Sequence, residues 1–159
     1  MKLNIIAVGK IKQRYIQVGI DDFKKRLEKY SEVNVIEVKG EKIDSSQSSK
    51  QIEQMKEREG ERILARIPGD SYVFGLTVKG KPMTSKGLAK SIQNLQVQGY
   101  SEFTFLIGGA MGLSQIVLDE VDYQLSLSHM TFTHQMIRLI LLEQIYRALK
   151  IKRGEPYHK

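Results

Sequence analysis

Apolar segments of strand length alternate along this chain with segments whose apolar residues recur every three or four positions, and this alternation limits the fold more than any other feature. Residues 2–8 are typical of a buried strand, and Ile16, Ile20 and Phe23 follow at helical spacing. Four further strands are predicted at 33–38, 72–76, 103–107 and 123–127, and four further helices at 52–67, 85–98, 113–118 and 133–152. Such repetition predicts an α/β fold with a mainly parallel sheet and helices on both faces.

A chain of 159 residues is the size of one domain, so we expect a single domain over 1–159. The absence of cysteine excludes thiol nucleophiles, zinc–cysteine sites and disulfides. The longest apolar runs, such as 139–142, fall far short of the roughly 20 residues that span a bilayer. Residues 1–8 are too short an apolar stretch for a signal peptide. We therefore expect a soluble, cytoplasmic protein that makes no membrane contact.

The net charge of +7 is concentrated at the two ends of the chain. Residues 1–30 carry eight basic and three acidic side chains, and residues 147–159 carry five and one, whereas the 116 residues between them have twelve and fourteen. An anionic partner is therefore expected, and nucleic acid is the commonest such partner for a domain of this kind. A basic surface that is merely solvated is the alternative.

Three predicted strand ends carry residues suited to a ligand site, which in a parallel sheet lies beyond the carboxyl ends of the strands. These ends are Leu76, Gly108 and Leu127 with the following Ser128. The sequence GGAMG at 108–112 lets the backbone approach a ligand closely. The alternative is a tight turn in which the glycines serve packing alone. Residues 77–82 are predicted to form a loop, and a helix capped by Ser85 to follow it.

The common nucleotide-binding motifs do not fit. A Rossmann-type site needs its glycine motif after the first strand, where this chain has only Gly9-Lys10-Ile11, and a Walker loop needs a Gly-Lys-Ser or Gly-Lys-Thr triplet that the chain lacks. Nucleotide hydrolysis and dinucleotide-dependent redox chemistry are therefore disfavoured.

The last predicted helix is apolar on more than one side. Its apolar residues are Met136, Ile137, Leu139, Ile140, Leu141, Leu142, Ile145 and Tyr146. One side can pack on the sheet, and the other most simply packs on a second copy of the chain, so we expect a homodimer. The alternative is a helix that is central to its own domain.

The chain ends in a basic segment, residues 152–159, that also contains Tyr157 and His158. Arginine and lysine pair with phosphates and tyrosine stacks on bases, so this tail is a candidate RNA contact. The other two histidines, His129 and His134, lack metal-ligand spacing, and we interpret them as structural or loop residues. No metal site is expected.

The residues at 105–112, 125–134 and 143–148, together with the terminal Tyr157-His158-Lys159, closely resemble the ribosomal RNA large subunit methyltransferase H family of the SPOUT class. The resemblance extends over the whole chain, but its specific motifs lie in the part from Phe105 onward.

The resemblance implies a SPOUT fold with a C-terminal trefoil knot, S-adenosylmethionine as the cofactor, and a homodimer. It also implies methylation of N3 of a pseudouridine in 23S rRNA within the assembled ribosome. The residues expected to line the cofactor site are Leu76, Gly108, Leu127, Ser128, His129, Met130, Thr131 and Phe132.

The reaction requires the imide N3–H to lose its proton, and each unit between its pKa and ambient pH costs about 1.4 kcal/mol. His158 is a candidate to accept this proton, and Arg147 and Lys159 to lower the pKa of the imide. Tyr157 is a candidate to stack on the base or hydrogen-bond to it. The alternative for Arg147 is a salt bridge to Glu143, one turn earlier on the same helix.

Two other functions are compatible with the sequence. One is a SPOUT methyltransferase that modifies another RNA, such as tRNA. The other is a non-enzymatic basic protein that binds the ribosome by electrostatic attraction, with a glycine turn that only packs.

Overall fold

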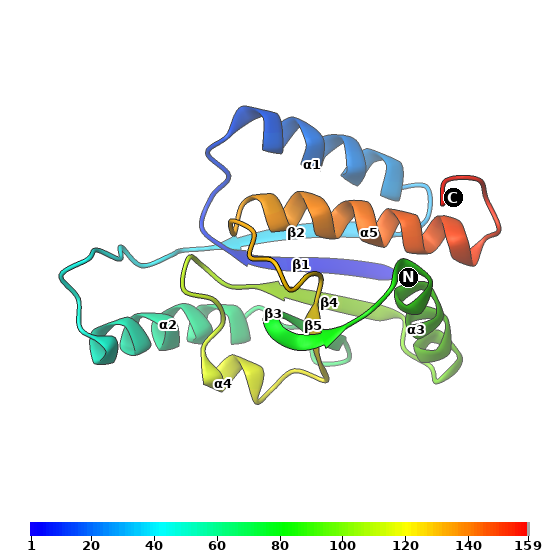
Figure 1. The fold of residues 1–159 in the computed structure, drawn as a ribbon. Helices are drawn as coiled ribbons and strands as arrows, with labels where there is room; N and C mark the ends of the chain where they lie inside the picture. Colours follow the sequence, from blue (N-terminus) through cyan, green and yellow to red (C-terminus); the bar gives the residue numbers. More distant parts are fainter. Residues whose placement is uncertain (159) are drawn as a thin grey trace.

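A computed structural model describes residues 1–158 of the chain, so Lys159 lies outside the described residues. Strands and helices alternate throughout, as the sequence pattern predicts (Figure 1). The elements are β1 (Lys2–Val8), α1 (Arg14–Leu27), β2 (Glu32–Val38), α2 (Ser49–Leu64), β3 (Tyr72–Pro82), α3 (Ser85–Val97), β4 (Glu102–Ile107), α4 (Gln115–Leu118), β5 (Tyr123–Ser126) and α5 (Met136–Lys152).

The five strands form one sheet in the order β2-β1-β4-β3-β5, and each neighbouring pair is parallel. The expected α/β fold is therefore confirmed. Because the strands are parallel, their carboxyl ends share one edge of the sheet, which is where ligands bind in folds of this kind. We refer to it as the carboxyl edge, and to the opposite one as the amino edge.

The two faces of the sheet are covered by different helices. Side chains alternate along a strand, so Leu3 and Ile5 of β1 point into one core while Ile6 and Val8 point into the other. Helices α1, α3 and α5 contribute to the first core, and α2 and α4 to the second (Figure 1). Each face therefore has its own apolar layer.

Helix α5 is central to the first core, because it packs between α1 and α3. The approach of α1 is close: a Cβ at Gly19 would lie 2.9 Å from a methyl carbon of Leu139. Most of the apolar surface of α5 is thus buried within the chain itself, as the alternative interpretation expected. One stripe remains only half-buried, and it consists of Ile137, Ile140, Gln144 and Arg147.

Two local predictions were wrong. Residues 77–82 were expected to be a loop, yet β3 continues to Pro82, with a register shift in which Leu76 and Lys81 both pair with Leu125. Gly80 permits this path, since a Cβ there would lie 2.7 Å from the backbone oxygen of Gln124. The second wrong prediction concerns the N-cap of α3, which the sequence pattern assigned to Ser85.

The residue that caps α3 is Thr84, whose hydroxyl accepts the N–H of Gly87 at 2.9 Å. Ser85 instead lies in the first turn of α3, and its hydroxyl donates to the side chain of Gln144 at 2.6 Å. The hydroxyl that the sequence pattern assigned to capping therefore links α3 to α5.

Candidate functional site

The three predicted strand ends adjoin one another at the carboxyl edge. Gly75 pairs with Leu106 on β4, and Leu76 pairs with Leu125 on β5, so β3 lies between the other two strands. Neighbouring strands are about 4.8 Å apart. The structure therefore brings together Leu76, Gly108 and the segment that begins at Leu127, which are distant in sequence.

The glycine turn after β4 closes tightly on itself. A Cβ at Gly108 would lie 2.3 Å from the carbonyl carbon of Gly112, and Gly109 forms a bridge with Gly112, which has a φ of 81°. Packing within the turn therefore requires Gly108, whether or not a ligand binds. The same turn leaves Met111 46% exposed at the carboxyl edge.

Hydrogen bonds of Ser128 shape the segment from Leu127 to Phe132. The Ser128 hydroxyl accepts the backbone N–H of Met130 at 2.9 Å, and its carbonyl accepts the Ser126 hydroxyl at 3.0 Å. The bend leaves Met130 75% and Phe132 39% exposed. Val78 on β3 and Met111 in the glycine turn are also exposed, so each of the three strand ends is followed by an exposed apolar side chain, which is typical of a binding surface.

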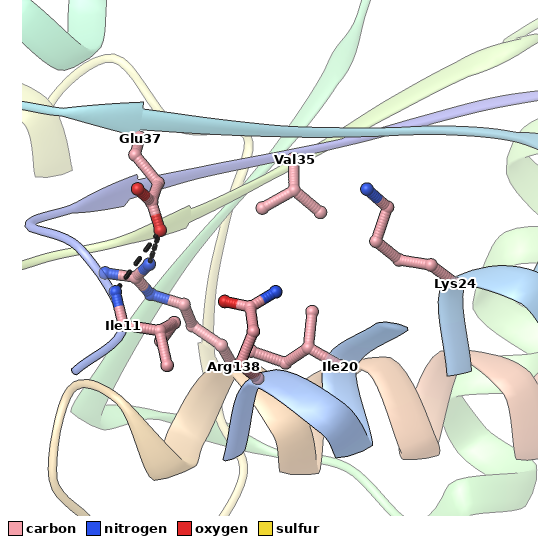
Figure 2. Close-up of a pocket in the computed structure, with 7 residues that line it drawn as sticks. Ile11, Ile20, Lys24, Val35, Glu37 and Arg138 are labelled. Atoms are coloured by element: carbon pink, nitrogen blue, oxygen red, sulfur yellow. Dashed lines mark hydrogen bonds and ion pairs between the residues drawn. The ribbon is translucent and has the colours of Figure 1, made fainter. Parts of the chain in front are cut away.

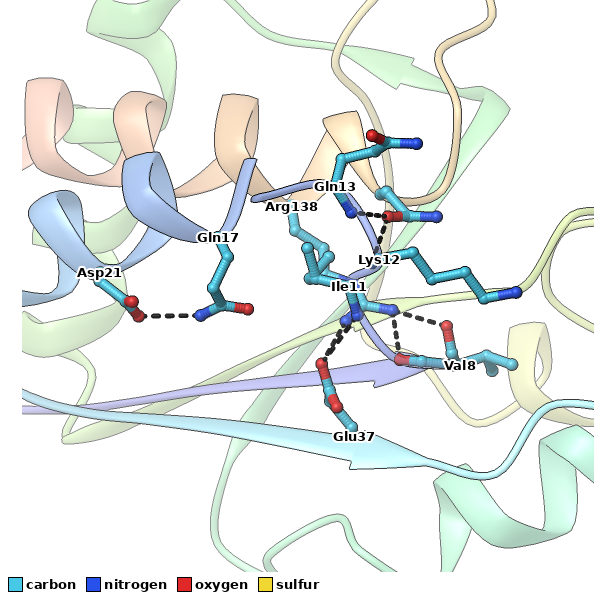
Figure 3. A network of polar contacts seen from close by, with 10 residues as sticks. Val8, Ile11, Lys12, Gln13, Gln17, Asp21, Glu37 and Arg138 are labelled. Carbon is cyan, nitrogen blue, oxygen red and sulfur yellow. Dashed lines mark hydrogen bonds and ion pairs between the residues drawn. The ribbon is translucent and has the colours of Figure 1, made fainter. Parts of the chain in front are cut away.

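The segment that leads into α5 is held to the end of β1 by Arg138, a residue that the sequence analysis did not single out. The side chain is 1% exposed. One guanidinium nitrogen donates to the carbonyls of Val8 and Gly9 at 2.6 and 2.7 Å, and another donates to Glu37 at 3.0 Å (Figure 3). The signal that could have found it is a cation within the otherwise apolar first two turns of α5, residues 136–142.

Arg138 also borders a cavity of about 340 Å³ between α1, β2 and α5 (Figure 2). Glu37 lies at the same end of the cavity, while Lys24 and Gln17 of α1 line it from the other side. Burial lowers the pKa of Arg138, and the charge of Glu37 opposes this change. Because the Glu37 side chain is 34% exposed, this ion pair is open to solvent on one side.

A buried carboxyl group adjoins the glycine turn from the other face of the sheet. Glu59 of α2 is 4% exposed, and a Cβ at Gly109 would lie 3.0 Å from its carboxylate. The carboxylate accepts the backbone N–H of Glu41 at 2.9 Å. Burial raises the pKa of Glu59 more than this hydrogen bond lowers it.

Glu59→Gln is expected to stabilise the protein at pH 7. A raised pKa means that the folded state holds the proton more tightly, so stability is lost as pH rises from the unfolded value near 4.5 through the folded pKa. Glutamine cannot ionise and keeps the oxygen that accepts the Glu41 N–H. The thermal unfolding midpoint should therefore fall less between pH 4 and pH 7 than in the wild type. Exposed Glu57→Gln is the control, and identical pH profiles for Glu59→Gln and the wild type would contradict the account.

The candidate substrate residues lie elsewhere, at the amino edge. The Tyr157 ring packs edge-on against Tyr146 at 4.9 Å between centroids, and its hydroxyl donates to Glu143 at 3.2 Å. Arg147 lies over the same ring, 4.7 Å from its centroid, and donates to Glu143 at 3.0 Å. The salt bridge that was the alternative for Arg147 is therefore present.

The tail after α5 folds back onto the protein near the start of β2. The Tyr30 hydroxyl donates to Glu155 at 2.7 Å, and Tyr30 lies two residues before the start of β2, at the amino edge. Burial raises the pKa of Tyr157, and the Glu143 charge adds to this effect. Nδ1 of His158 is shielded from solvent and has no hydrogen-bond partner within residues 1–158. Lys159 was also a candidate, but it lies outside the described residues.

The two groups of candidate residues are thus at opposite edges of the sheet. Helix α5 starts near the carboxyl edge and has 17 residues, so at 1.5 Å per residue its far end is about 25 Å away. Figure 1 shows both chain ends on the side away from the α5 start. Within one chain, Tyr157 and His158 do not meet Leu76, Gly108 or the segment from Leu127 to Phe132.

Residues 1–158 contain neither a metal-binding cluster nor a helix that could span a membrane. No group of three or more His, Asp or Glu side chains in this range is arranged to hold a metal ion. No helix in the same range is both long and apolar enough to cross a membrane. His134 packs near Gly9. Burial is the main cause that lowers the pKa of His134, and the positive charges of Arg138 and Lys12 lower it further.

The comparisons with known proteins agree with this fold. The family model described as "Predicted SPOUT methyltransferase" matches residues 1–158. A probable methylase family protein from Haemophilus influenzae has a similar structure, with a TM-score of 0.52 and 12% identity over 99% of this chain and 70% of that chain. The chain belongs to the SPOUT methyltransferase family, whose cofactor is S-adenosylmethionine.

Two relatives match the entire chain. The protein named "Ribosomal RNA large subunit methyltransferase H" from Halothermothrix orenii is 70% identical over 159 residues, and the protein of the same name from Clostridioides difficile is 52% identical over 159 residues. Each match covers 100% of both chains. This chain is therefore a methyltransferase.

Proposed function

We propose that the protein transfers a methyl group from S-adenosylmethionine to N3 of a pseudouridine in 23S rRNA, within the assembled ribosome in the cytoplasm. The observation that carries the proposal is the full-length similarity, at 70% and 52% identity, to relatives named for large-subunit rRNA methylation. The positive charge at both ends of the chain supports an RNA substrate.

The cofactor is proposed to bind at the carboxyl edge. Leu76, Gly108, Leu127, Ser128, His129, Met130, Thr131 and Phe132 would line its site. Their segments adjoin, and the apolar side chains near them suit the adenine ring, while backbone groups at the strand ends suit its polar parts. When bound, S-adenosylmethionine supplies a methyl group that its sulfonium makes electrophilic. The chain's own task is to align the base with that group and to exclude water.

A homodimer is proposed because one chain separates the two halves of the site. Ile137 and Ile140 of the half-buried stripe of α5, together with exposed Met130 and Phe132, would offer apolar side chains to a second copy. The tail of one subunit would then lie beside the proposed cofactor residues of its partner, around Gly108 and from Leu127 to Phe132. The trefoil knot that the family resemblance implies also stays a prediction.

The tail is proposed to prepare the base. His158 would accept the N3 proton, leaving on N3 the electron pair that forms the bond to the methyl carbon. Arg147 and Lys159 would favour the imide anion by their positive charge, and Tyr157 would stack on the base or hydrogen-bond to it. Glu143 now holds Arg147 and Tyr157, so RNA binding would have to replace these contacts.

Assembled ribosomal particles should be methylated far faster than deproteinised 23S rRNA. The excess positive charge of the chain lies in short segments at its two ends, so its grip on RNA would rest on these basic segments and on the shape of the particle. The measurement is transfer of a labelled methyl group to intact ribosomes, isolated large subunits and purified rRNA at equal concentrations. Equal rates on particles and purified rRNA would contradict the proposed substrate.

A further inference from the structure

The short connection between β1 and α1, residues 9–13, is held firmly although it lies on the surface. Gln135 accepts the backbone N–H groups of Lys12 and Gln13 at 2.8 and 3.4 Å (Figure 3). Arg138 binds the carbonyls of Val8 and Gly9 at the start of the same connection. The two anchoring side chains come from the N-cap and the first turn of α5, shortly after the segment from Leu127 to Phe132, which we call the cofactor segment. We call residues 10–15 the basic strap.

The basic strap presents cations and an aromatic ring to solvent. Lys10, Lys12 and Arg14 are exposed, and Tyr15 is 64% exposed. None of these three cations forms a salt bridge with the residues described by the structure. The first turn of α1 contains no acidic side chain, so the positive end of the helix dipole adds to the field. Free cations beside an exposed aromatic ring suit RNA, whose phosphates pair and whose bases stack.

The strap also adjoins the carboxyl edge. β1 pairs with β4 through Ala7 and Ile107, so Gly9 lies next to the glycine turn that begins at Gly108. A Cβ at Gly109 would lie 3.2 Å from a methyl carbon of Val8. The basic strap is therefore bordered by the glycine turn on one side and by the start of α5 on the other.

We propose that the basic strap binds RNA phosphates on the cofactor side of the substrate, and that Gln135 fixes its position relative to the cofactor segment. The inference rests on the proposed function and adds a second RNA contact to the basic tail. The two contacts would grip the RNA on both sides of the target base. Lys10, Lys12 and Arg14 act by binding, and Gln135 is a positioning residue.

The test is the triple variant K10A/K12A/R14A. Its affinity for large ribosomal subunits and for an rRNA stem-loop should fall by about 30-fold at moderate salt, and the slope of log affinity against log salt should decrease by about 2. Binding of S-adenosylmethionine, measured by calorimetry, and the unfolding midpoint should not change. The matched control removes the same charge elsewhere, at the exposed residues Lys50, Lys86 and Lys90 of α2 and α3.

An equal loss of affinity in both triple variants would show that the strap contributes only through the net charge of the protein, and this would overturn the inference. Unchanged RNA affinity in the strap variant would also overturn it. RNA affinity is measured separately from methyl transfer. If the wild type binds the stem-loop but methylates no ribosomal particle, the proposed reaction is refuted. RNA binding by the strap is then still tested by the affinity measurements.

Gln135→Ala tests the positioning role. Its loss frees the strap, so the KM for ribosomal particles should rise several-fold while the affinity for S-adenosylmethionine stays the same. Gln135→Glu keeps an oxygen that accepts the two N–H groups and should restore most of the lost affinity. Failure of Gln135→Ala to change the KM would remove Gln135 from the proposal.

Discussion

Arg138→Met is expected to lower the free energy of unfolding by about 3–5 kcal/mol, because it removes the buried partner of a charged and hydrogen-bonded network. Methionine fills a similar volume but leaves the carbonyls of Val8 and Gly9 without their donor, and Glu37 without its cation. For a chain of 159 residues this corresponds to a fall of about 10 °C in the unfolding midpoint. Chemical denaturation followed by circular dichroism measures the effect.

Two further variants make this prediction specific. Arg138→Lys keeps the charge but not the planar fork that reaches three acceptors, so its loss should be intermediate. Arg66→Met removes an exposed arginine of the α2–β3 connection and should stay within about 0.5 kcal/mol of the wild type. Equal stability of Arg138→Met and Arg66→Met would show that the buried network does not hold α5 to β1.

His158→Ala should reduce methyl transfer at least about 100-fold, the lower range for loss of a group that moves a proton in the rate-limiting step. Cofactor binding should be unchanged, since His158 is proposed to act on the base and is not among the residues proposed to line the cofactor site. Single-turnover rates with ribosomal particles, together with calorimetry for S-adenosylmethionine, separate the two effects. Retained turnover would remove His158 from the mechanism.

Mixing two inactive variants tests whether the site is shared between subunits. Gly108→Val disrupts the glycine turn and leaves the tail intact, whereas His158→Ala does the reverse. If the tail of one subunit serves its partner, a mixed dimer retains one intact site, and random re-association should restore about a quarter of wild-type activity. Exchange is induced by mild denaturation and refolding, and the wild type treated in the same way is the control. No recovery with mixed dimers present would contradict a shared site.

The order of elements and the parallel sheet were predictable because they depend on local patterns. Residues 2–8 and the helical repeat after them each mark their own element, and alternation along the chain then selects a parallel sheet. The extension of β3 was not predictable, because it depends on how closely Gly80 approaches the backbone of Gln124. That contact joins segments more than 40 residues apart.

The candidate site was predictable in part, because some of its residues are placed by the local strand pattern and the topology that follows from it. Gly108 and Leu127 follow β4 and β5, and Leu76 lies just before the register shift of β3, so the topology places all three at one edge. Arg138 and Gln135 were missed because their partners are backbone groups of the β1–α1 connection, which no sequence motif marks. The residues Tyr157 and His158 do not themselves indicate at which edge of the sheet the tail lies. The length and direction of α5 determine that the tail lies at the amino edge.

The central claim is the identity of the modified base, and mass spectrometry of 23S rRNA tests it most directly. Ribosomal RNA is isolated from cells with and without this protein, digested, and mapped for methylated nucleosides. The account predicts a single N3-methylated pseudouridine that is lost without the protein and restored by the wild-type chain but not by His158→Ala. Unchanged 23S rRNA, with a methyl group lost instead from tRNA, would contradict it.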